Sequence, residues 1–321
     1  GYKGWVLHLW LALVYESSNI ADNHSVNVIN WLLVRYLFSL SNEQGSVAKF
    51  TKMKNIIIIL LLLFTFKGFS QEDEKSKKIK SLGYKVEKEY EYLTKFGEID
   101  KSTEFMIKRI EFNEKGKEKK IEIYYRGDDK NEYSMISTYK YNEKSEPIKL
   151  VYYNFKGDIE DIIKYEYQDS LMKVMRIYSK DGELKRKVDY SYNKQNEPTK
   201  YISYSEKGKL LRKTTYEYNS NNQLTRENSF DRESKLKTYI LYKNTDSTEV
   251  YKEYNDKDEV VLEISKKLNP KKQVISRLWS SLLNPYPTKT IYEYDSYGLE
   301  IKTTVFGENG EPIEFRIIER N

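Results

Sequence analysis

Tyrosine and basic side chains recur in neighbouring segments of the chain at a spacing that would bring them together on one surface. In residues 184–192 and 210–218, alternate positions carry leucine, arginine and tyrosine, whereas the positions between them carry mostly polar residues. Aromatic rings beside cations are the groups that stack on sugar rings or on bases. We therefore take as a candidate surface ladder Tyr190, Tyr192, Tyr216, Tyr218, Arg186, Arg212 and Trp279.

A plainer interpretation of the same residues is that the rings pack between strands and cover a sheet. Trp279 is the only tryptophan after residue 31, and Pro285 and Pro287 follow it closely. We expect residues 281–284 to form a short helix or loop that interrupts the pattern. Trp279 would then be either a contact site on an irregular loop or a side chain that fills a corner of the fold.

Histidine and cysteine chemistry is restricted by composition. The two histidines, His8 and His24, lie near the start of the sequence, and the chain has no cysteine. Beyond residue 24 this composition excludes histidine-based general base catalysis, histidine-ligated metal sites and disulfides. We predict no cofactor and no metal site.

Acidic side chains are frequent, and several lie close together in sequence, as in residues 158–161 and 256–259. Glycoside hydrolysis requires two carboxyl groups held at a set separation, but in a chain with 49 acidic residues such neighbours are expected by chance. The run Asn255–Asp258 offers few oxygen ligands and includes Lys257, so we interpret it as a turn rather than a Ca²⁺ site. We predict no catalytic residue and expect that the protein is not an enzyme.

The elements that would position the ladder are repeats of about 25 residues. Two aromatic series interleave along the chain at steps of 24–26 residues, with one double step of 52 in each. The first series consists of Tyr141, Tyr167, Tyr192, Tyr218, Tyr242 and Tyr294. The second series consists of Tyr153, Tyr178, Tyr204, Phe230, Tyr254 and Phe306. Half of such a repeat accommodates one strand and one tight turn.

The segments between the aromatic residues have turn chemistry, because they end in residues that adopt positive φ readily. These residues are Gly116, Gly182, Gly208, Gly310, Asn196 and Asn222. We therefore predict an all-β fold, an antiparallel meander of repeated hairpins that forms an extended, twisted or rolled single sheet. In the intervening strands Arg176, Lys200 and Arg226 fall at equivalent places, so we expect ladders of basic residues beside the ladders of tyrosine.

The segments Tyr216–Leu224 and Tyr292–Leu299 resemble the Tyr-Asp repeats of the RHS/YD family of secreted bacterial proteins, whose motif is roughly Tyr-x-Tyr-Asp-x-x-Gly-x-Leu. The similarity covers about residues 139–321, although asparagine often replaces aspartate and the spacing drifts. The resemblance implies β-sheets that roll into shells or spirals, some of which enclose a toxin. We expect the present chain to be too short to close such a shell.

The segment from Met53 to Ser70 has the layout of a secretory signal peptide. Lys54 is basic, residues 55–66 are almost purely apolar, and Gly68 and Ser70 are small residues before a cut at Gln71. This apolar run spans about 18 Å as a helix, which is short of the ~30 Å bilayer core, although a membrane anchor is the alternative. The predicted segments are residues 1–52, as non-native upstream translation or a disordered or membrane segment, 53–70 as signal peptide, 71–82 as a charged linker and 83–321 as the tyrosine-rich β-repeat domain.

The charge balance argues against nucleic acid as a partner. Residues 1–70 hold six of the 55 basic and three of the 49 acidic residues, so the remainder has a net charge of only about +3. We predict an exported protein, periplasmic or secreted, that acts as a non-enzymatic binding or scaffold protein. The sequence does not identify its ligand, and a cell-surface glycan or a protein would fit.

Two alternatives accompany this prediction. One is a component of a contact-dependent toxin system, either a truncated carrier or an immunity-like partner. The other is a glycan-binding or glycan-processing protein. With a cut before Gln71 we expect no stable membrane anchor, and the exposed end strands of an open sheet would permit self-association.

Overall fold

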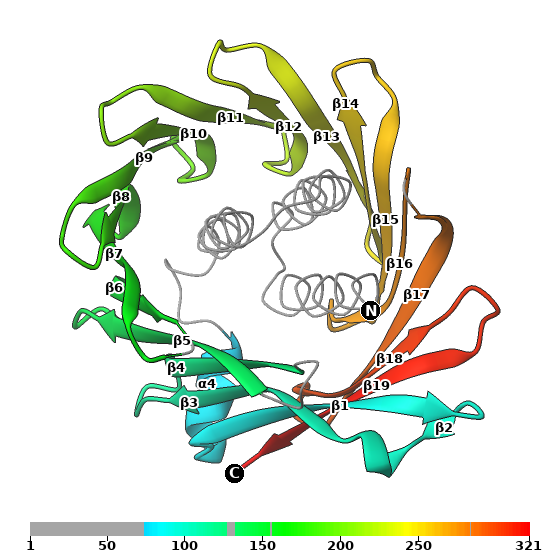
Figure 1. Cartoon of the computed structure of the whole chain (residues 1–321). Helices are drawn as coiled ribbons and strands as arrows, with labels where there is room; N and C mark the ends of the chain where they lie inside the picture. Colours follow the sequence, from blue (N-terminus) through cyan, green and yellow to red (C-terminus); the bar gives the residue numbers. More distant parts are fainter. Residues whose placement is uncertain (1–73, 127–131, 155, 283) are drawn as a thin grey trace, which may run out of the picture. The chain divides into compact units, whose positions relative to one another are not determined.

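The computed structural model describes residues 74–126, 132–154, 156–282 and 284–321. In these residues the helix α4 (Glu74–Leu82) precedes nineteen β-strands, and the 3-10 helix η2 (Lys101–Thr103) follows β2 (Figure 1). The strands are β1 (Val86–Lys95), β2 (Glu98–Ile99), β3 (Phe105–Phe112), β4 (Glu118–Arg126), β5 (Glu132–Tyr141), β6 (Pro147–Tyr153), β7 (Ile159–Gln168), β8 (Leu171–Ser179), β9 (Leu184–Tyr192), β10 (Pro198–Ser205), β11 (Leu210–Tyr218), β12 (Leu224–Phe230), β13 (Leu236–Asn244), β14 (Thr248–Asn255), β15 (Val260–Leu268), β16 (Val274–Ser281), β17 (Asn284–Tyr294), β18 (Glu300–Phe306) and β19 (Pro312–Arg320). The predicted all-β antiparallel fold is confirmed.

The strands form a closed ring rather than an open sheet (Figure 1). From β3 to β19 each strand pairs antiparallel with the next, and β1 pairs with β3 on one side and with β19 on the other. Because β2 only extends one end of β1, eighteen of the nineteen described strands make up the ring. The expectation that the chain is too short to close is therefore wrong. The end strands expected to permit self-association pair with each other.

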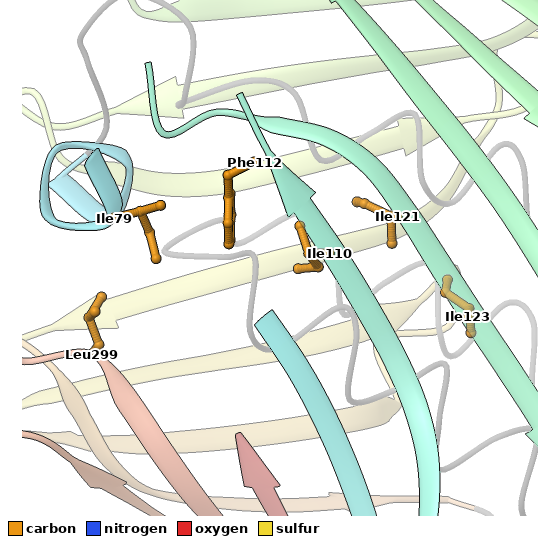
Figure 2. Close-up of a cluster of buried hydrophobic side chains, with 6 residues drawn as sticks. All are labelled: Ile79, Ile110, Phe112, Ile121, Ile123 and Leu299. Carbon is orange, nitrogen blue, oxygen red and sulfur yellow. The ribbon is translucent and has the colours of Figure 1, made fainter. Parts of the chain in front are cut away.

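The segment expected to be a charged linker, residues 71–82, contains the helix α4, so this expectation is wrong over Glu74–Leu82. Ile79 is completely buried in a cluster with Phe112 of β3 and Leu299 beside β18, as Figure 2 shows. The helix forms because the strands supply the apolar partners that its own sequence lacks. The predicted segments 1–52 and 53–70 lie outside the described residues. Within the described part of the chain, no helix is long and apolar enough to cross a membrane.

Alternate residues of each strand point to opposite faces of the ring. Strand register continues one face from strand to strand; for example, Tyr201 of β10 lies opposite Tyr190 of β9 and Thr214 of β11. This face holds most of the completely buried side chains, including Ile110, Ile163, Met175, Thr214, Ile240, Tyr251, Glu253, Ile264, Thr303 and Arg316. Side chains converge on the concave face of a closed sheet, so we take the buried face as the inner face and the other as the outer face.

Twelve turns in the described residues share one geometry. The backbone N–H of the first turn residue donates to the carbonyl four residues later, and the fourth residue has a positive φ. In the turn that starts at Asn219, the side-chain Oδ1 also accepts from the backbone N–H groups of Asn221 and Gln223. All six glycines and asparagines that were predicted to end the turns occupy the positive-φ position. The turn prediction is therefore confirmed.

The first tyrosine series ties neighbouring strands together. At the end of β11 the Tyr218 hydroxyl donates to the carbonyl of Pro198, at the start of β10, over 2.8 Å. Equivalent bonds join Tyr141 to Glu118, Tyr167 to Pro147, Tyr192 to Met172 and Tyr294 to Val274. A phenol hydroxyl reaches a backbone carbonyl of the adjacent strand, which explains tyrosine rather than phenylalanine at these positions.

The region around Trp279 is more regular than the sequence indicated. Residues 281–284 do not form a helix: β16 runs to Ser281 and β17 begins at Asn284. Trp279 is buried on the inner face opposite Ile264 of β15. Of the two roles considered for it, the structure therefore shows a side chain that fills the fold.

Candidate functional site

All seven residues of the predicted ladder lie on the inner face, so they share a face as expected. Because these residues are buried or half-buried, that face is not an exposed platform. Tyr190, Tyr216 and Trp279 are buried, whereas Tyr192 and Tyr218 are half-buried with their hydroxyls bound to backbone carbonyls. The Arg212 guanidinium donates to the Ser229 hydroxyl over 2.7 Å. Arg186 lies one strand pair away, opposite Ser205.

The basic ladder expected beside these tyrosines lies on the other face. Arg176 pairs with Lys187 across β8 and β9, Lys200 lies opposite Ser191, and Arg226 lies opposite Leu241. These are outer-face positions, because the bulges that end each strand pair shift the register by one residue. The expectation that they lie beside the inner tyrosines is wrong.

Two glutamates that the sequence interpretation missed lie near Arg212 on the inner face. Glu227 of β12 and Glu253 of β14 both lie opposite Ile240 of β13, one from each side. Glu227 is 4% exposed and Glu253 is 0% exposed. Both positions could have been found by continuing the strand alternation from the turns through β12 and β14, because each glutamate falls in the apolar register.

The environment shifts the pKa values of all three charged groups. Burial raises the pKa of Glu227 to about 7, although Arg212 and the Tyr242 hydroxyl oppose the rise. Burial also raises the pKa of Glu253 to about 8. Burial alone would lower the pKa of Arg212, but nearby tyrosines and Glu227 outweigh it, so the pKa rises. The cluster therefore holds one fixed cation and two carboxyl groups that titrate near neutrality.

Of the two glutamates, Glu253 has the surroundings that are less favourable to a charged carboxylate. Its carboxyl group lies near the Thr238 hydroxyl, yet neither oxygen accepts a hydrogen bond of normal geometry from any described residue. A neutral carboxylic acid is the form that such burial favours. The pair can thus take up and release protons between about pH 7 and 8, and this is the chemistry that its geometry allows.

The acidic neighbours noted in the sequence do not come together. Asp161 is buried on the inner face and forms an ion pair with Lys185, whereas Asp158 lies in an exposed turn. Asn255 caps its turn by accepting from the backbone N–H groups of Lys257 and Glu259. Among the described residues, no group of three or more potential ligands is arranged to hold a metal ion.

The second aromatic series lies on the outer face, where all six rings are half-buried. We call these six residues the outer aromatic row. Lys213 lies opposite Phe230 with its ammonium 5.0 Å from the ring centre, and Lys289 lies 5.3 Å from the ring of Phe306. The row continues with Lys164 5.0 Å from Tyr178. Cations thus accompany aromatic rings on this face too.

Comparisons with known proteins give weak likenesses. No protein-family model and no curated protein sequence matches the chain. Among solved structures, the chain is similar to porin-like proteins from Bacteroides uniformis (TM-score 0.41, 11% identity, 74% of this chain and 96% of that one) and Bacteroides vulgatus (0.25, 11%, 73% and 97%). It is also similar to part of the Photorhabdus luminescens Tc holotoxin pore (0.25, 10%, 67% and 16%).

Proposed function

We propose that the protein is an exported, non-enzymatic β-barrel of the bacterial envelope that acts as a binding scaffold through its outer face. The signal-peptide pattern of residues 53–70 supports export. Polar outward positions such as Lys187, Asp189 and Lys213 support a barrel surrounded by water, because a membrane-spanning barrel needs an apolar outward band. Cell fractionation tests this location, and the protein should be found in the periplasmic or the secreted fraction.

The observation that carries the binding role is the outer aromatic row. Its half-buried rings recur at steps of 24–26 residues with one double step, and Lys213 and Lys289 stand beside two of them. Ring faces stack on sugars, and ammonium groups pair with carboxylates or sulfates. An acidic glycan that runs round the barrel is the ligand that this arrangement fits best. The fixed spacing of the strands would hold successive sites in register.

A glycan array combined with a whole-cell pull-down tests this role. The full chain should bind acidic glycans, and the double variant Lys213→Gln, Lys289→Gln should bind them about fivefold more weakly or worse. The matched control is Lys194→Gln with Lys271→Gln, because both lysines are exposed in turns at the opposite rim from the row. Capture of one protein partner without any glycan binding would contradict the proposal that the ligand is a glycan.

A polysaccharide-processing enzyme is the second candidate, favoured by the Glu227–Glu253 pair. The two Cα atoms are separated by two strand spacings, about 10 Å, and paired carboxyl groups with different pKa values are typical of such enzymes. Both groups are buried, however, so a substrate would have no access to them in this conformation. Hydrolysis of a cell-wall or capsular polysaccharide that disappears in Glu227→Gln would favour the enzyme over the scaffold.

A further inference from the structure

A pocket of about 470 Å³ opens on the inner face at the rim of the barrel that carries the first tyrosine series. The β5–β6 turn borders it on one side, the β7–β8 connection borders it on the other, and Tyr165 and Tyr167 contribute to its wall. This connection consists only of Asp169 and Ser170, both with positive φ, whereas five residues, 193–197, join β9 to β10. The short connection leaves a notch in the rim, and the notch explains the pocket.

Two buried polar atoms in the pocket have no hydrogen-bond partner among the described residues. Glu146 is 3% exposed and Tyr165 is 5% exposed. Among the described residues, neither Glu146 Oε1 nor the Tyr165 hydroxyl has a hydrogen-bond partner. The other carboxylate oxygen of Glu146 accepts from Asn142 Nδ2 over 2.6 Å, which holds the side chain in place. Buried polar groups are normally paired, so this pocket is suited to a ligand that supplies a donor.

The charge of the pocket selects the kind of donor. Glu143, Glu146 and Asp169 line it together with one basic residue, Lys144, which is exposed. Asp169 is exposed and forms no ion pair with any described residue. An excess of carboxylates around an unpaired carboxylate oxygen favours a cation over a neutral donor.

A second short connection on the same rim shows how a side chain of the protein fills the notch that such a connection leaves. Only residues 245–247 join β13 to β14. The Lys272 ammonium, from the next turn round the rim, donates to the Asp246 carbonyl over 2.9 Å and to its carboxylate over 3.1 Å. Beside the β7–β8 connection the corresponding turn position, the fourth, is held by Asn196, which carries no charge. At one notch an ammonium from the next turn therefore binds the connection, whereas at the other this turn position is Asn196 and the lining lysine, Lys144, is exposed.

We propose that the rim pocket binds an organic cation, a primary ammonium or guanidinium group on a short aliphatic chain, in the role that Lys272 has at the other notch. The cation donates to Glu146 Oε1 and to the Tyr165 hydroxyl oxygen, and Asp169 balances its charge. The Tyr167 ring and Ile148 contact the aliphatic part. The source is a free amine or the lysine or arginine side chain of a peptide. This site is separate from the outer aromatic row and does not depend on its function.

Isothermal titration calorimetry of the full chain tests the proposal with butylammonium chloride, the peptide acetyl-Gly-Lys-Gly-amide and neutral 1-butanol at equal ionic strength. The two cations should bind saturably, and 1-butanol should not. Glu146→Gln should weaken cation binding about tenfold or more. The control Glu183→Gln removes an exposed carboxylate at the opposite rim and should leave the affinity unchanged. A peptide affinity well above that of butylammonium would assign the site to a basic peptide; equal affinities would assign it to a free amine.

Asn196→Lys provides a second variant that leaves Glu146 intact. Lysine at this turn position tolerates a positive φ, as Lys272 shows with 62°. The new ammonium should lie near Asp169 and weaken butylammonium binding several-fold. The proposal is overturned if 1-butanol binds as tightly as butylammonium, if neither cation binds, or if a folded Glu146→Gln variant, checked by circular dichroism, keeps the full affinity.

Discussion

The closing seam, formed by β19, β1, β3 and α4, and the repeat wall, formed by β10–β14, both place glutamates on the inner face, but their surroundings differ. In the seam, Glu87 accepts from Lys75 of α4 over 3.1 Å and from Arg320 of β19 over 2.6 Å. Burial alone would raise the pKa of Glu87, but these cations lower it to about 2. In the wall, burial dominates at Glu253 and raises its pKa to about 8.

The difference follows from how each region forms. The wall consists of hairpins whose partners are neighbours in sequence, so backbone pairing and turns are sufficient to align them. The seam joins residues 233 positions apart and has no turn to fix its register. A buried carboxylate that meets both of its cations only in one register penalises every other register. We interpret the two ion pairs of Glu87 as the contacts that specify how β1 and β19 pair to close the ring. The wall glutamates, in contrast, lower the free energy of unfolding as they ionise.

Among the single substitutions, breaking the seam should have the largest effect. Glu87→Gln leaves the buried Arg320 guanidinium without its carboxylate and should lower the free energy of unfolding by about 3–5 kcal/mol. Urea denaturation followed by tryptophan fluorescence measures this change. The exposed control Glu183→Gln should stay within about 0.5 kcal/mol of the parent protein. A loss of the same small size in both variants would show that the seam does not depend on this carboxylate.

The pH dependence of stability should separate the two regions. The folded protein keeps protons on Glu227 and Glu253 up to about pH 7 and 8, whereas the unfolded chain releases them near 4.5, the ordinary pKa of a glutamate. The free energy of unfolding should therefore fall by roughly 4–6 kcal/mol between pH 5 and 8. Glu87 acts in the opposite direction, because its lowered pKa makes stability fall as the pH drops from 4.5 towards 2.

Replacing one wall glutamate sharpens this test. Glu253→Met removes the carboxyl group with no hydrogen bond from a described residue and keeps a similar volume beside Ile240 and Leu262. Thermal unfolding followed across the pH range should show a gain of about 1–3 kcal/mol at pH 8 and little change at pH 5. A loss of stability at pH 8 would mean that the Glu253 carboxylate has a stabilising partner.

Contact with α4 distinguishes two glycines that have the same backbone geometry. A β-carbon on Gly116 would lie 2.2 Å from the Ser76 carbonyl oxygen of α4, whereas one on Gly208 would meet nothing within 4 Å. Both glycines have positive φ, so each alanine variant loses about 1 kcal/mol from backbone strain. Gly116→Ala should lose about 2–3 kcal/mol in total because α4 must move. Equal losses in urea denaturation would show that α4 contributes little to the seam.

Local features of the fold could be predicted from the sequence because their causes lie within one hairpin. Gly182 and Asn196 indicated the turns through their tolerance of positive φ, and the alternation ending in Tyr190 indicated which residues share a face. Closure could not be predicted in this way. It depends on the register between β1 and β19, and no short-range pattern specifies a pairing between the two ends of the domain.

The candidate site shows the same limit. The ladder residues were placed on one face correctly, but whether that face is inside or outside depends on curvature, which the strand pattern does not contain. The shifted pKa values of Glu227 and Glu253 arise from burial by neighbouring strands and not from their own sequence. The rim pocket arises because the β7–β8 connection is shorter than the neighbouring β9–β10 turn, which becomes visible only once the strand ends are known.

Removing a tyrosine hydroxyl from the wall should have the smallest effect on the free energy of unfolding. Tyr218→Phe removes the hydrogen bond to the Pro198 carbonyl and should lower the free energy of unfolding by about 1 kcal/mol. Tyr204→Phe is the matched control, because this half-buried outer tyrosine forms no hydrogen bond through its hydroxyl to a described residue. It should change stability by less than about 0.5 kcal/mol in the same urea denaturation. If both variants behave alike, the repeated tyrosines are retained for ring packing, and the wall is held together by backbone pairing and turns alone.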